Sequence, residues 1–334
     1  MELKNNIKKS GFSPYAVNGF VIRSPLTANN AGNCTWGYAY KYGRQFFIKQ
    51  FLNPKFPKPD ADMYESTRAR MVAECEKWYS AHSRVYKAIL ECGGSNIVNP
   101  LDFFNYENTY YLVTEKINSC GVSFMDIYKK SEEQKQVIMK ILAYEISRLA
   151  EKKVIHSDLK PENLILKETV NGFFTVKIID FDAGFLENEP PEPDDLTGDQ
   201  VYFSPEMILY MNEEEVTVTP KSDVFALGVL FHIILSGKMP GYDEKYDCIG
   251  LAVLNGDEPQ MSGYIDEYTK NIIKDMLSAD PEKRPDAFEV FLRLGGKKPE
   301  SSAGSAVKTA AEKSGSRVTS SGLVINMKKS SSGK

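Results

Sequence analysis

The order of strand-like and helix-like patterns constrains the fold of this chain more than any other feature. From Phe20 to Gln50 the sequence reads FVIRSPL, CTWGYAYKY and RQFFIKQF, rich in aromatic and β-branched residues, with a tight turn at Gly43. This pattern predicts an antiparallel meander. After a Pro-rich connection, residues 64–91 place apolar side chains at alternating spacings of three and four, which predicts a long amphipathic helix.

Helical patterns replace strands in the rest of the chain. Two more strand candidates, residues 96–104 and 109–115, complete the first third. From Ser123 to about Leu294 helices dominate, with one hairpin predicted across Asn171-Gly172. We therefore expect an α+β fold of two lobes, in which a small antiparallel β-sheet lobe with one major helix precedes a larger α-helical lobe.

These patterns divide the chain into four stretches. We expect an N-terminal extension at 1–10, the small lobe and hinge at 11–118, and the large lobe at 119–295. Residues 296–334 are rich in Ser, Gly and Lys and contain too few apolar residues to fold alone, so a disordered tail is expected there. Such a tail is either a linker or a regulatory or docking segment.

Composition excludes several classes of protein. The 334 residues carry a net charge of −4, which argues against nucleic acid as a partner. The five scattered cysteines form no CxxC pair and fit a reducing cytosol. The N-terminus lacks the apolar stretch of a signal peptide, and the longest apolar run, residues 224–235, is too short for a bilayer. We expect a cytoplasmic protein that does not cross a membrane.

Residues 154–166, VIHSDLKPENLIL, carry the strongest chemical signal. Asp158, Lys160 and Asn163 project from one short loop between apolar flanks. A carboxylate can accept the proton of an incoming hydroxyl, an ammonium can balance phosphate charge, and an amide oxygen can coordinate magnesium. These residue types at this spacing indicate phosphoryl transfer.

A second acidic site follows at the end of an apolar strand. In residues 177–184, KIIDFDAG, Asp180 can face phosphates and hold Mg²⁺. We expect Asn163 and Asp180 to be the metal ligands. Asp182 is either a turn residue or a further contributor to metal or substrate binding.

Both segments resemble those of the eukaryotic-type (Hanks-type) serine/threonine protein kinases. HSDLKPEN resembles the catalytic loop H-R-D-L-K-x-x-N, with Ser157 in place of Arg, and DFD resembles the DFG element, with Asp182 in place of Gly. Residues 198–206 and 221–228 resemble the end of the activation segment and the helix that anchors the large lobe. The family's order is kept, which implies a protein-kinase fold, the cofactors ATP and Mg²⁺, and transfer to Ser or Thr of protein substrates.

The resemblance also implies roles for these residues. Asp158 orients and deprotonates the substrate hydroxyl, and Lys160 supports the transferring phosphoryl group. Since Ser157 replaces the Arg that gathers a phosphorylated activation loop, this non-RD catalytic loop implies constitutive or partner-controlled activity. Glu206 is expected to pair with Arg284. The left-handed backbone angles that Asp tolerates would allow Asp182 at the glycine position.

On the nucleotide side, FFIK at residues 46–49 resembles V-A-I-K and makes Lys49 the ligand of the α- and β-phosphates. Its expected partner is a helix glutamate, Glu76 in preference to Glu74. Only Gly32 matches the Gly-rich loop, and Phe47 stands where Ala usually lines the adenine pocket. The nucleotide-contacting residues implied are Gly32, Cys34, Phe47, Lys49, Glu76, Thr114, Glu115, Ile117 and Ile165. Cys34 and Ile165 sandwich adenine, Thr114 is the gatekeeper, and residues 115–117 form the hinge.

Two other functions remain open. A pseudokinase, a nucleotide-binding or scaffold protein, is suggested by the degenerate Gly-rich loop and by Phe47. A small-molecule kinase of the aminoglycoside type would also carry H-x-D-x-x-x-x-N followed by I-D-x-x-D. The acidic segment 187–199 is either a solvated loop or a feature that favours basic substrate peptides.

A narrower resemblance links the chain to bacterial kinases that accompany metal-dependent phosphatases and von Willebrand A-type proteins. It rests on the insertion NPKFPKP, the FFIK strand and the FDAGF variant. This resemblance implies a cognate metal-dependent protein phosphatase that reverses autophosphorylation. The Ser-rich tail is one segment where that autophosphorylation would occur.

Overall fold

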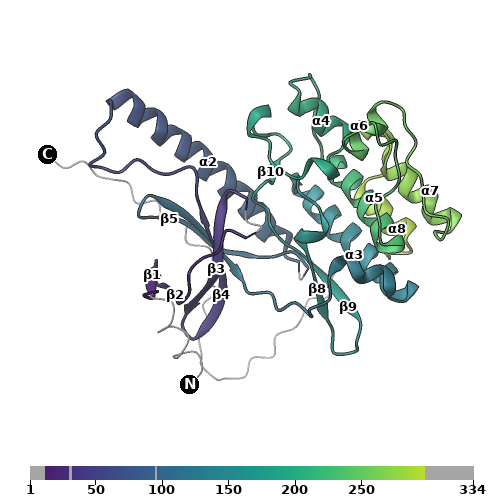
Figure 1. Cartoon of the computed structure of the whole chain (residues 1–334), viewed down its shortest axis with the longest axis horizontal. Coiled ribbons are helices and arrows are strands. Elements are labelled where there is room, and N and C mark those ends of the chain that lie inside the picture. The colour runs from purple at the N-terminus through teal and green to yellow at the C-terminus, as the bar shows by residue number, and fades with distance from the viewer. Residues whose placement is uncertain (1–11, 30–31, 95, 298–334) are drawn as a thin grey trace, which may run out of the picture. The chain divides into compact units, whose positions relative to one another are not determined.

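The computed structural model of the chain describes residues 12–29, 32–94 and 96–297 (Figure 1). The extension expected at 1–10 lies outside these ranges. So does the tail expected at 296–334, apart from Gly296 and Lys297. Both expectations stay predictions, as does the boundary between the lobes.

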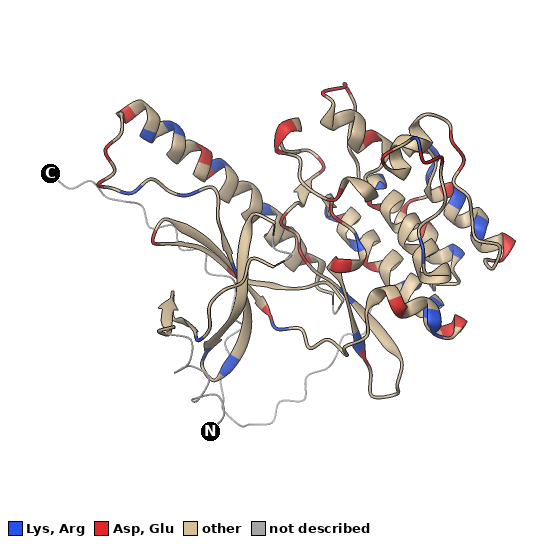
Figure 2. Cartoon of the chain, in the orientation of Figure 1, with Lys and Arg blue, Asp and Glu red and all other residues tan. Residues whose placement is uncertain are grey.

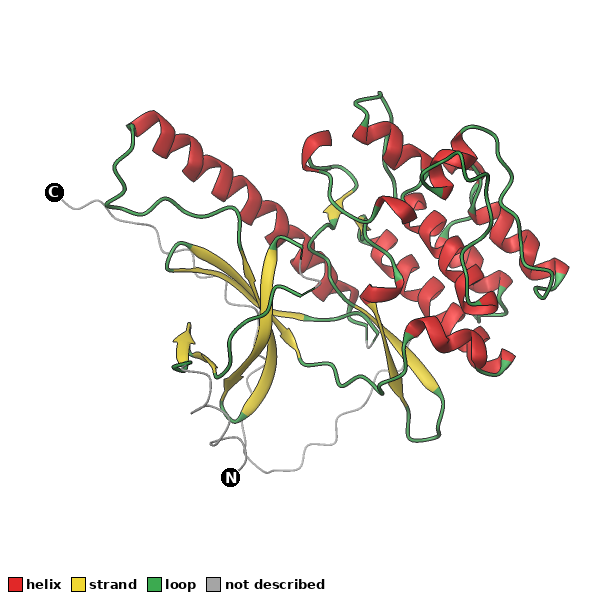
Figure 3. Cartoon of the chain, viewed as in Figure 1, coloured by secondary structure: helices red, strands yellow, loops and turns green. Residues whose placement is uncertain are grey.

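The first third of the chain folds into a six-stranded sheet with the order β1-β2-β3-β4-β6-β5, in which all neighbours are antiparallel (Figure 3). The strands are β1 Tyr15–Val17, β2 Phe20–Ile22, β3 Cys34–Lys41, β4 Arg44–Phe51, β5 Pro100–Tyr106 and β6 Thr109–Glu115. The turn between β3 and β4 uses left-handed angles at Tyr42 (φ 49°) and Gly43 (φ 74°), as a two-residue hairpin of type I′ requires. The predicted meander is confirmed.

The predicted amphipathic helix is confirmed as α2, Glu65–Cys92. Its apolar stripe includes Cys75, Val85 and Ile89, which are buried in the largest core cluster. The helix ends at Gly93 in a left-handed conformation (φ 58°), whose N–H bonds to a carbonyl of the last turn.

Helices dominate from residue 124 onward, as predicted (Figure 3). The α-helices are α3 Glu132–Glu151, α4 Pro205–Met211, α5 Lys221–Ser236, α6 Ile249–Leu254, α7 Glu267–Met276 and α8 Ala287–Arg293. The short 3₁₀ turns are η1 Phe124–Lys129, η2 Pro161–Asn163, η3 Pro193–Asp195, η4 Gln200–Tyr202 and η5 Pro281–Lys283. The strands are β7 Val154–Ile155, β8 Leu164–Glu168, β9 Phe174–Ile178 and β10 Phe185–Leu186; β8 pairs with β9 in the predicted hairpin, and β10 with β7.

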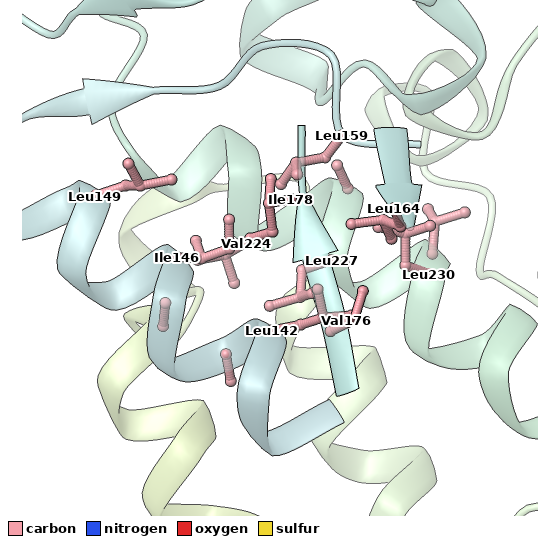
Figure 4. Packing of buried hydrophobic residues seen from close by; sticks show 14 of the residues in the cluster. Leu142, Ile146, Leu149, Leu159, Leu164, Val176, Ile178, Val224, Leu227 and Leu230 are labelled. Carbon is pink, nitrogen blue, oxygen red and sulfur yellow. The ribbon is translucent and has the colours of Figure 1, made fainter. Parts of the chain in front are cut away.

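The core of the helical part lies where α3, α5 and the β8–β9 hairpin meet. In Figure 4, side chains from these elements point toward one another, among them Leu142 of α3, Val176 of β9 and Leu227 of α5. All three are fully buried. Because the loop between β7 and β8 follows α3 and leads into this hairpin, apolar burial holds both of its ends in place.

Within residues 12–29, 32–94 and 96–297, no helix combines the length and the apolar composition that a membrane crossing requires.

Candidate active site

The loop between β7 and β8 brings together the three polar residues expected to carry phosphoryl transfer. Asn163 donates its side-chain amide to the Asp158 carboxylate (Nδ2 to Oδ2, 2.9 Å) and to the Asp158 backbone oxygen (2.7 Å). Lys160 Nζ lies 3.0 Å from Asp158 Oδ1. The carboxylate of Asp158 is therefore oriented from both sides before any substrate binds.

Asp223, at the start of α5, supports this loop from beneath. Its buried carboxylate accepts hydrogen bonds from the backbone N–H groups of His156 (2.8 Å) and Ser157 (3.1 Å). Ser157 has a left-handed backbone (φ 67°), a conformation that costs free energy for a residue with a Cβ. Burial raises the pKa of Asp223, although the two N–H bonds and His156 oppose that rise. Asp223 thus stabilises the strained turn that presents Asp158.

His156 is a scaffold residue of the same turn. Its Nδ1 accepts a hydrogen bond from the backbone N–H of Asp158 (3.3 Å), so the ring proton resides on Nε2, which lies 3.0 Å from the carbonyl oxygen of Ile179. The ring centroid is 4.5 Å from that of Phe181. His156 therefore connects the catalytic loop to the segment after β9 and takes no chemical role.

Asp180 follows β9 and faces the sheet. Its backbone is left-handed (φ 66°), whereas Asp182 is not among the positive-φ residues. The left-handed angle therefore falls two residues before the position where it was expected. Lys49 Nζ, from the middle of β4, lies 2.6 Å from Asp180 Oδ1 and 2.8 Å from Asp182 Oδ2. This cluster joins the sheet to the segment after β9.

Mutual attraction sets the charges of this cluster. Burial lowers the pKa of Lys49, but Asp182 and Asp180 outweigh it, so that pKa lies above its ordinary value. Burial raises the pKa of Asp180, but the charge and hydrogen bond of Lys49 bring it below its ordinary value. Burial and the Asp180 charge raise the pKa of Asp182 to about 6. The shifted pKa values thus favour the charged forms of the Lys49 ammonium and the Asp180 carboxylate.

The expected pairing of Lys49 with Glu76 is wrong. Glu76 and Glu74 are both exposed on α2, and Glu74 pairs with Arg70 (3.7 Å). The physical reason is the helical period: both glutamates flank buried Cys75, and a residue next to a core-facing position is rotated about 100° away from the core.

The comparisons with known proteins decide the family. The model of the protein kinase domain matches residues 71–293, more than half of the chain. The chain belongs to the protein kinase family. This match confirms the bilobal α+β kinase fold expected from the motifs.

Three relatives of this kinase illustrate the similarity. A MAP kinase-interacting serine/threonine-protein kinase 2 from Xenopus laevis is 30% identical over 245 residues, covering 63% of this chain and 52% of the relative. A calcium/calmodulin-dependent serine/threonine-protein kinase from Malus domestica is 32% identical over 204 residues, covering 59% and 47%. Protein kinase kin1 from Schizosaccharomyces pombe is 24% identical over 287 residues, covering 82% and 30%. The chain thus spans about half the length, or less, of these relatives.

The predicted pair of Glu206 and Arg284 is present in this kinase. Both terminal nitrogens of the guanidinium group bind the Glu206 carboxylate, Nη1 to Oε1 at 2.6 Å and Nη2 to Oε2 at 2.7 Å. The remaining N–H groups of Arg284 reach the carbonyl oxygens of Ser278, Ala279 and Lys221. All five donors are satisfied in a side chain that is 0% exposed, so the pair anchors α4 after the activation segment.

The expected adenine-side residues lie on the same face of the sheet as Lys49. Phe47 is two residues before Lys49 on β4 and opposite Thr114 on β6. Its ring stacks on Trp36, with centroids 5.5 Å apart and planes at 27°. Trp36 itself lies opposite Lys49 on β3. Sequence reasoning missed Trp36, although its pairing follows once the turn at Gly43 sets the β3–β4 register.

The other expected nucleotide residues lie on several elements of the fold. Cys34 begins β3, where burial raises the pKa of its thiol to about 11. The charge of Lys49 lowers this pKa, and the charges of Asp182 and Asp180 raise it. Thr114 is buried, and its hydroxyl donates to the Glu115 carbonyl (3.2 Å). Ile117 packs against the largest core cluster, and Ile165 lies on β8. Gly32 takes a left-handed backbone (φ 52°) next to residues outside the described ranges.

Lys177 is a second residue that sequence reasoning did not assign. It is buried on β9, opposite Ile165, and its ammonium bonds to the Ile97 carbonyl oxygen (3.0 Å) and to the Glu115 carboxylate. A lysine within an apolar strand is a signal for such a buried partner. This contact ties Glu115, the first residue of the expected hinge, to the β8–β9 hairpin.

The donor set fits magnesium when the nucleotide supplies the other ligands. Among the described residues, no three His, Cys, Asp or Glu side chains gather into a complete metal cluster. Asn163 uses both amide hydrogens on Asp158, which leaves its Oδ1 oxygen as an acceptor, and its backbone oxygen accepts from the Ile179 N–H (2.9 Å), one residue before Asp180. Magnesium typically takes one or two protein oxygens beside water and phosphate oxygens.

Proposed function

We propose that this chain is an ATP-dependent protein kinase that transfers the γ-phosphate to Ser or Thr of protein substrates, with autophosphorylation. The observation that carries the proposal is the convergence of Asp158, Lys160 and Asn163 in one loop, with Lys49 and Asp180 paired across from it. The serine/threonine kinases among the relatives support the choice of acceptor.

In the proposed mechanism, Asp158 accepts a hydrogen bond and then the proton from the substrate hydroxyl as the hydroxyl oxygen attacks the γ-phosphorus of ATP. The bond from this phosphorus to the β–γ bridging oxygen breaks, and ADP is the leaving group. Lys160 shields the charge between this carboxylate and the transferred group. Lys49 binds the α- and β-phosphates and keeps the nucleotide in place. Asn163 and Asp180 would hold Mg²⁺, which neutralises phosphate charge when bound.

The geometry supports activity without phosphorylation of the activation segment. The hydroxyl of Ser157 donates to the carbonyl oxygen of Thr197 (3.3 Å), and Asp158 Oδ1 accepts from the backbone N–H of Asp199 (2.8 Å). These contacts, one to a backbone carbonyl and one to the Asp158 carboxylate, attach the segment to the catalytic loop without an arginine or a phosphate. Control by a partner protein, including a cognate metal-dependent phosphatase, belongs to the same proposal.

The charge of the activation segment favours basic substrates. Residues 187–199 contain six acidic residues and no Lys or Arg (Figure 2). Among these residues, Glu192, Asp194 and Asp195 are exposed. Acidic surfaces beside a site steer cationic peptides toward it. Cys75, Cys92, Cys120 and Cys248 are free thiols, which fits the reducing cytosol proposed as the location.

The two competing functions are less well supported. A pseudokinase would not need the oriented Asp158 and Asn163 or the cluster of Lys49 with Asp180. A small-molecule kinase would not need the Glu206–Arg284 anchor, which positions a segment for protein substrates. The acceptor distinguishes a protein kinase from a small-molecule kinase, because phosphate appears on protein in the first case and on a small molecule in the second.

The proposal is tested by incubating the purified chain with Mg²⁺ and γ-labelled ATP, alone and with a basic protein substrate. We expect label on protein, and a reduction of at least about 100-fold in Asp158→Asn, because loss of a general base removes roughly 10²- to 10⁴-fold in rate. Asp180→Ala should also lose the label, because it removes a proposed ligand of Mg²⁺. Glu267→Gln, an exposed carboxylate on α7, is the matched control and should keep full activity. No label, together with no rise in melting temperature on adding ATP, would contradict the proposal.

A further inference from the structure

Lys49 obtains both of its carboxylate partners from the segment after β9. Its ammonium is 2.6 Å from Asp180 and 2.8 Å from Asp182, and its side chain is 9% exposed. Of the described α2 residues, His82 and Tyr86 form hydrogen bonds to this cluster. Neither is acidic, so the helix reaches the cluster without a charge of opposite sign to Lys49.

Asp182 is held by α2 through these two residues. The buried Tyr86 hydroxyl donates to Asp182 Oδ1 (3.4 Å), while Lys49 binds the other oxygen, Oδ2. His82 Nε2 lies 3.3 Å from the backbone oxygen of Asp182. One carboxylate thus bridges a helix phenol and a strand ammonium, and its backbone is tied to the same helix.

The charges along the interface between α2 and this segment have the same arrangement. Arg84 of α2 pairs with Glu189 (2.6 Å), and Lys77 of α2 pairs with Glu192 (3.2 Å). The helix therefore supplies the cations and the segment supplies the carboxylates. A helix glutamate facing Lys49 would be the opposite arrangement, and its absence leaves Asp182 as the group that connects Lys49 to α2.

We propose that Asp182 is a positioning residue that takes the place of a helix carboxylate as the partner of Lys49. The inference rests on the proposed function, in which Lys49 binds the phosphates. Asp180 is needed there as a metal ligand, so it is not available as a permanent partner of Lys49. Asp182 keeps the ammonium aimed at the phosphates and makes its position depend on α2 through Tyr86.

Kinetics of charge-removing variants test this role. Asp182→Asn keeps the side-chain shape, and we expect kcat/KM for ATP to fall by roughly 10- to 100-fold, because hydrogen bonds to charged groups contribute about 1.5–3 kcal/mol. The Mg²⁺ concentration needed for half-maximal rate should stay unchanged, unlike in Asp180→Asn. Glu74→Gln and Glu76→Gln remove carboxylates from α2 and should match the wild type. A normal Asp182→Asn enzyme beside an impaired Glu76→Gln enzyme would overturn the inference.

Two combined variants ask whether Asp182 acts through Lys49. Lys49→Met with Asp182→Asn should be no slower than Lys49→Met alone, since the partner is already gone. In His82→Glu with Asp182→Asn, a carboxylate is supplied from the helix instead, and we expect partial recovery of the activity lost in Asp182→Asn. Losses that multiply in the first variant would overturn the inference, because Asp182 would then act independently of Lys49.

A measurement without nucleotide separates this inference from the proposed function. Urea unfolding of the nucleotide-free wild type, Lys49→Met, Asp182→Asn and the double variant should give non-additive shifts of the midpoint. Additive shifts would overturn the pairing. Because this cycle needs no catalysis, it decides the pairing even if the wild type transfers no phosphate, a result that would count against the proposed function alone.

Discussion

Arg284 and Lys49 are both buried cations, and their surroundings differ in a way that separates a structural anchor from a working site. The side chain of Arg284 is 0% exposed and that of Lys49 is 9% exposed. Every N–H donor of Arg284 has a hydrogen-bond partner, and the side chain of Glu206, which supplies the paired carboxylate, is only 4% exposed. Lys49 instead meets Asp180 and Asp182, whose side chains are 31% and 25% exposed.

This difference follows from what each site must do. A guanidinium with all five donors satisfied has no capacity for a ligand, so the pair with Glu206 only holds α4 in place. An ammonium shared by two carboxylates that face an open side can exchange partners when phosphates and a metal bind. Complete burial keeps the Arg284–Glu206 pair fixed, and partial exposure leaves Lys49 and its aspartates accessible to a ligand.

The largest expected effect on stability tests the buried pair of Arg284 and Glu206. Arg284→Met leaves the buried Glu206 carboxylate without a partner, and loss of one member of a buried ion pair costs about 3–5 kcal/mol of unfolding free energy. Urea unfolding measures it. Arg293→Met removes an arginine that pairs with Asp275 at a partly exposed site and should cost under about 1 kcal/mol. Equal losses of unfolding free energy in both variants would contradict the special role of complete burial in the Arg284–Glu206 pair.

An intermediate effect concerns a buried neutral group in the helical part. His232 Nε2 accepts from the Ser262 N–H (3.0 Å), so Nδ1 carries the proton opposite the Lys238 carbonyl oxygen (2.7 Å). Burial lowers the pKa of His232 below 6.5. The unfolded chain therefore takes up a proton first as pH falls, and the folded state loses stability below pH 6.5 by at most about 1.4 kcal/mol per pH unit.

Unfolding in urea between pH 7.5 and 5 measures this loss. His232→Gln offers a donor and an acceptor but no titration in this range, so its stability should fall less steeply than that of the wild type. Parallel pH profiles for the two proteins would contradict the assignment of a neutral imidazole.

The smallest expected effect lies at the interface between α2 and the activation segment. Arg84 and Glu189 are 46% and 43% exposed, and exposed pairs contribute about 0.2–1 kcal/mol. A double-mutant cycle of Arg84→Met and Glu189→Gln should therefore give a coupling within that range, which weakens as salt is added. A coupling above about 2 kcal/mol would mean that this exposed pair contributes to stability as a buried pair such as Arg284–Glu206 does.

Much of the site was predictable because its partners are close in sequence. Asp158, Lys160 and Asn163 lie within one loop, and the short spacing left few geometries open. Glu206 and Arg284 are far apart, yet each belongs to a recognisable motif, so their pairing followed from the resemblance. The strands and long helices followed from periods of two and of three to four residues.

The partner of Lys49 was not predictable in this way. Which side of α2 faces β4 depends on how Cys75, Val85 and Ile89 pack, and that packing turns Glu76 toward solvent. Asp182 reads as a turn residue from its neighbours alone. Its contact with Lys49 spans 133 positions and exists only because β9 ends beneath the sheet.

The family, the order of the elements and the residue types available for phosphoryl transfer could be predicted from the sequence, because these depend on local periods and short motifs. The pairing of Lys49 with Asp182 and the stacking of Trp36 on Phe47 became visible only in the folded chain. Those contacts depend on helix rotation and strand register, which are set by the burial of the whole apolar core and by no local pattern.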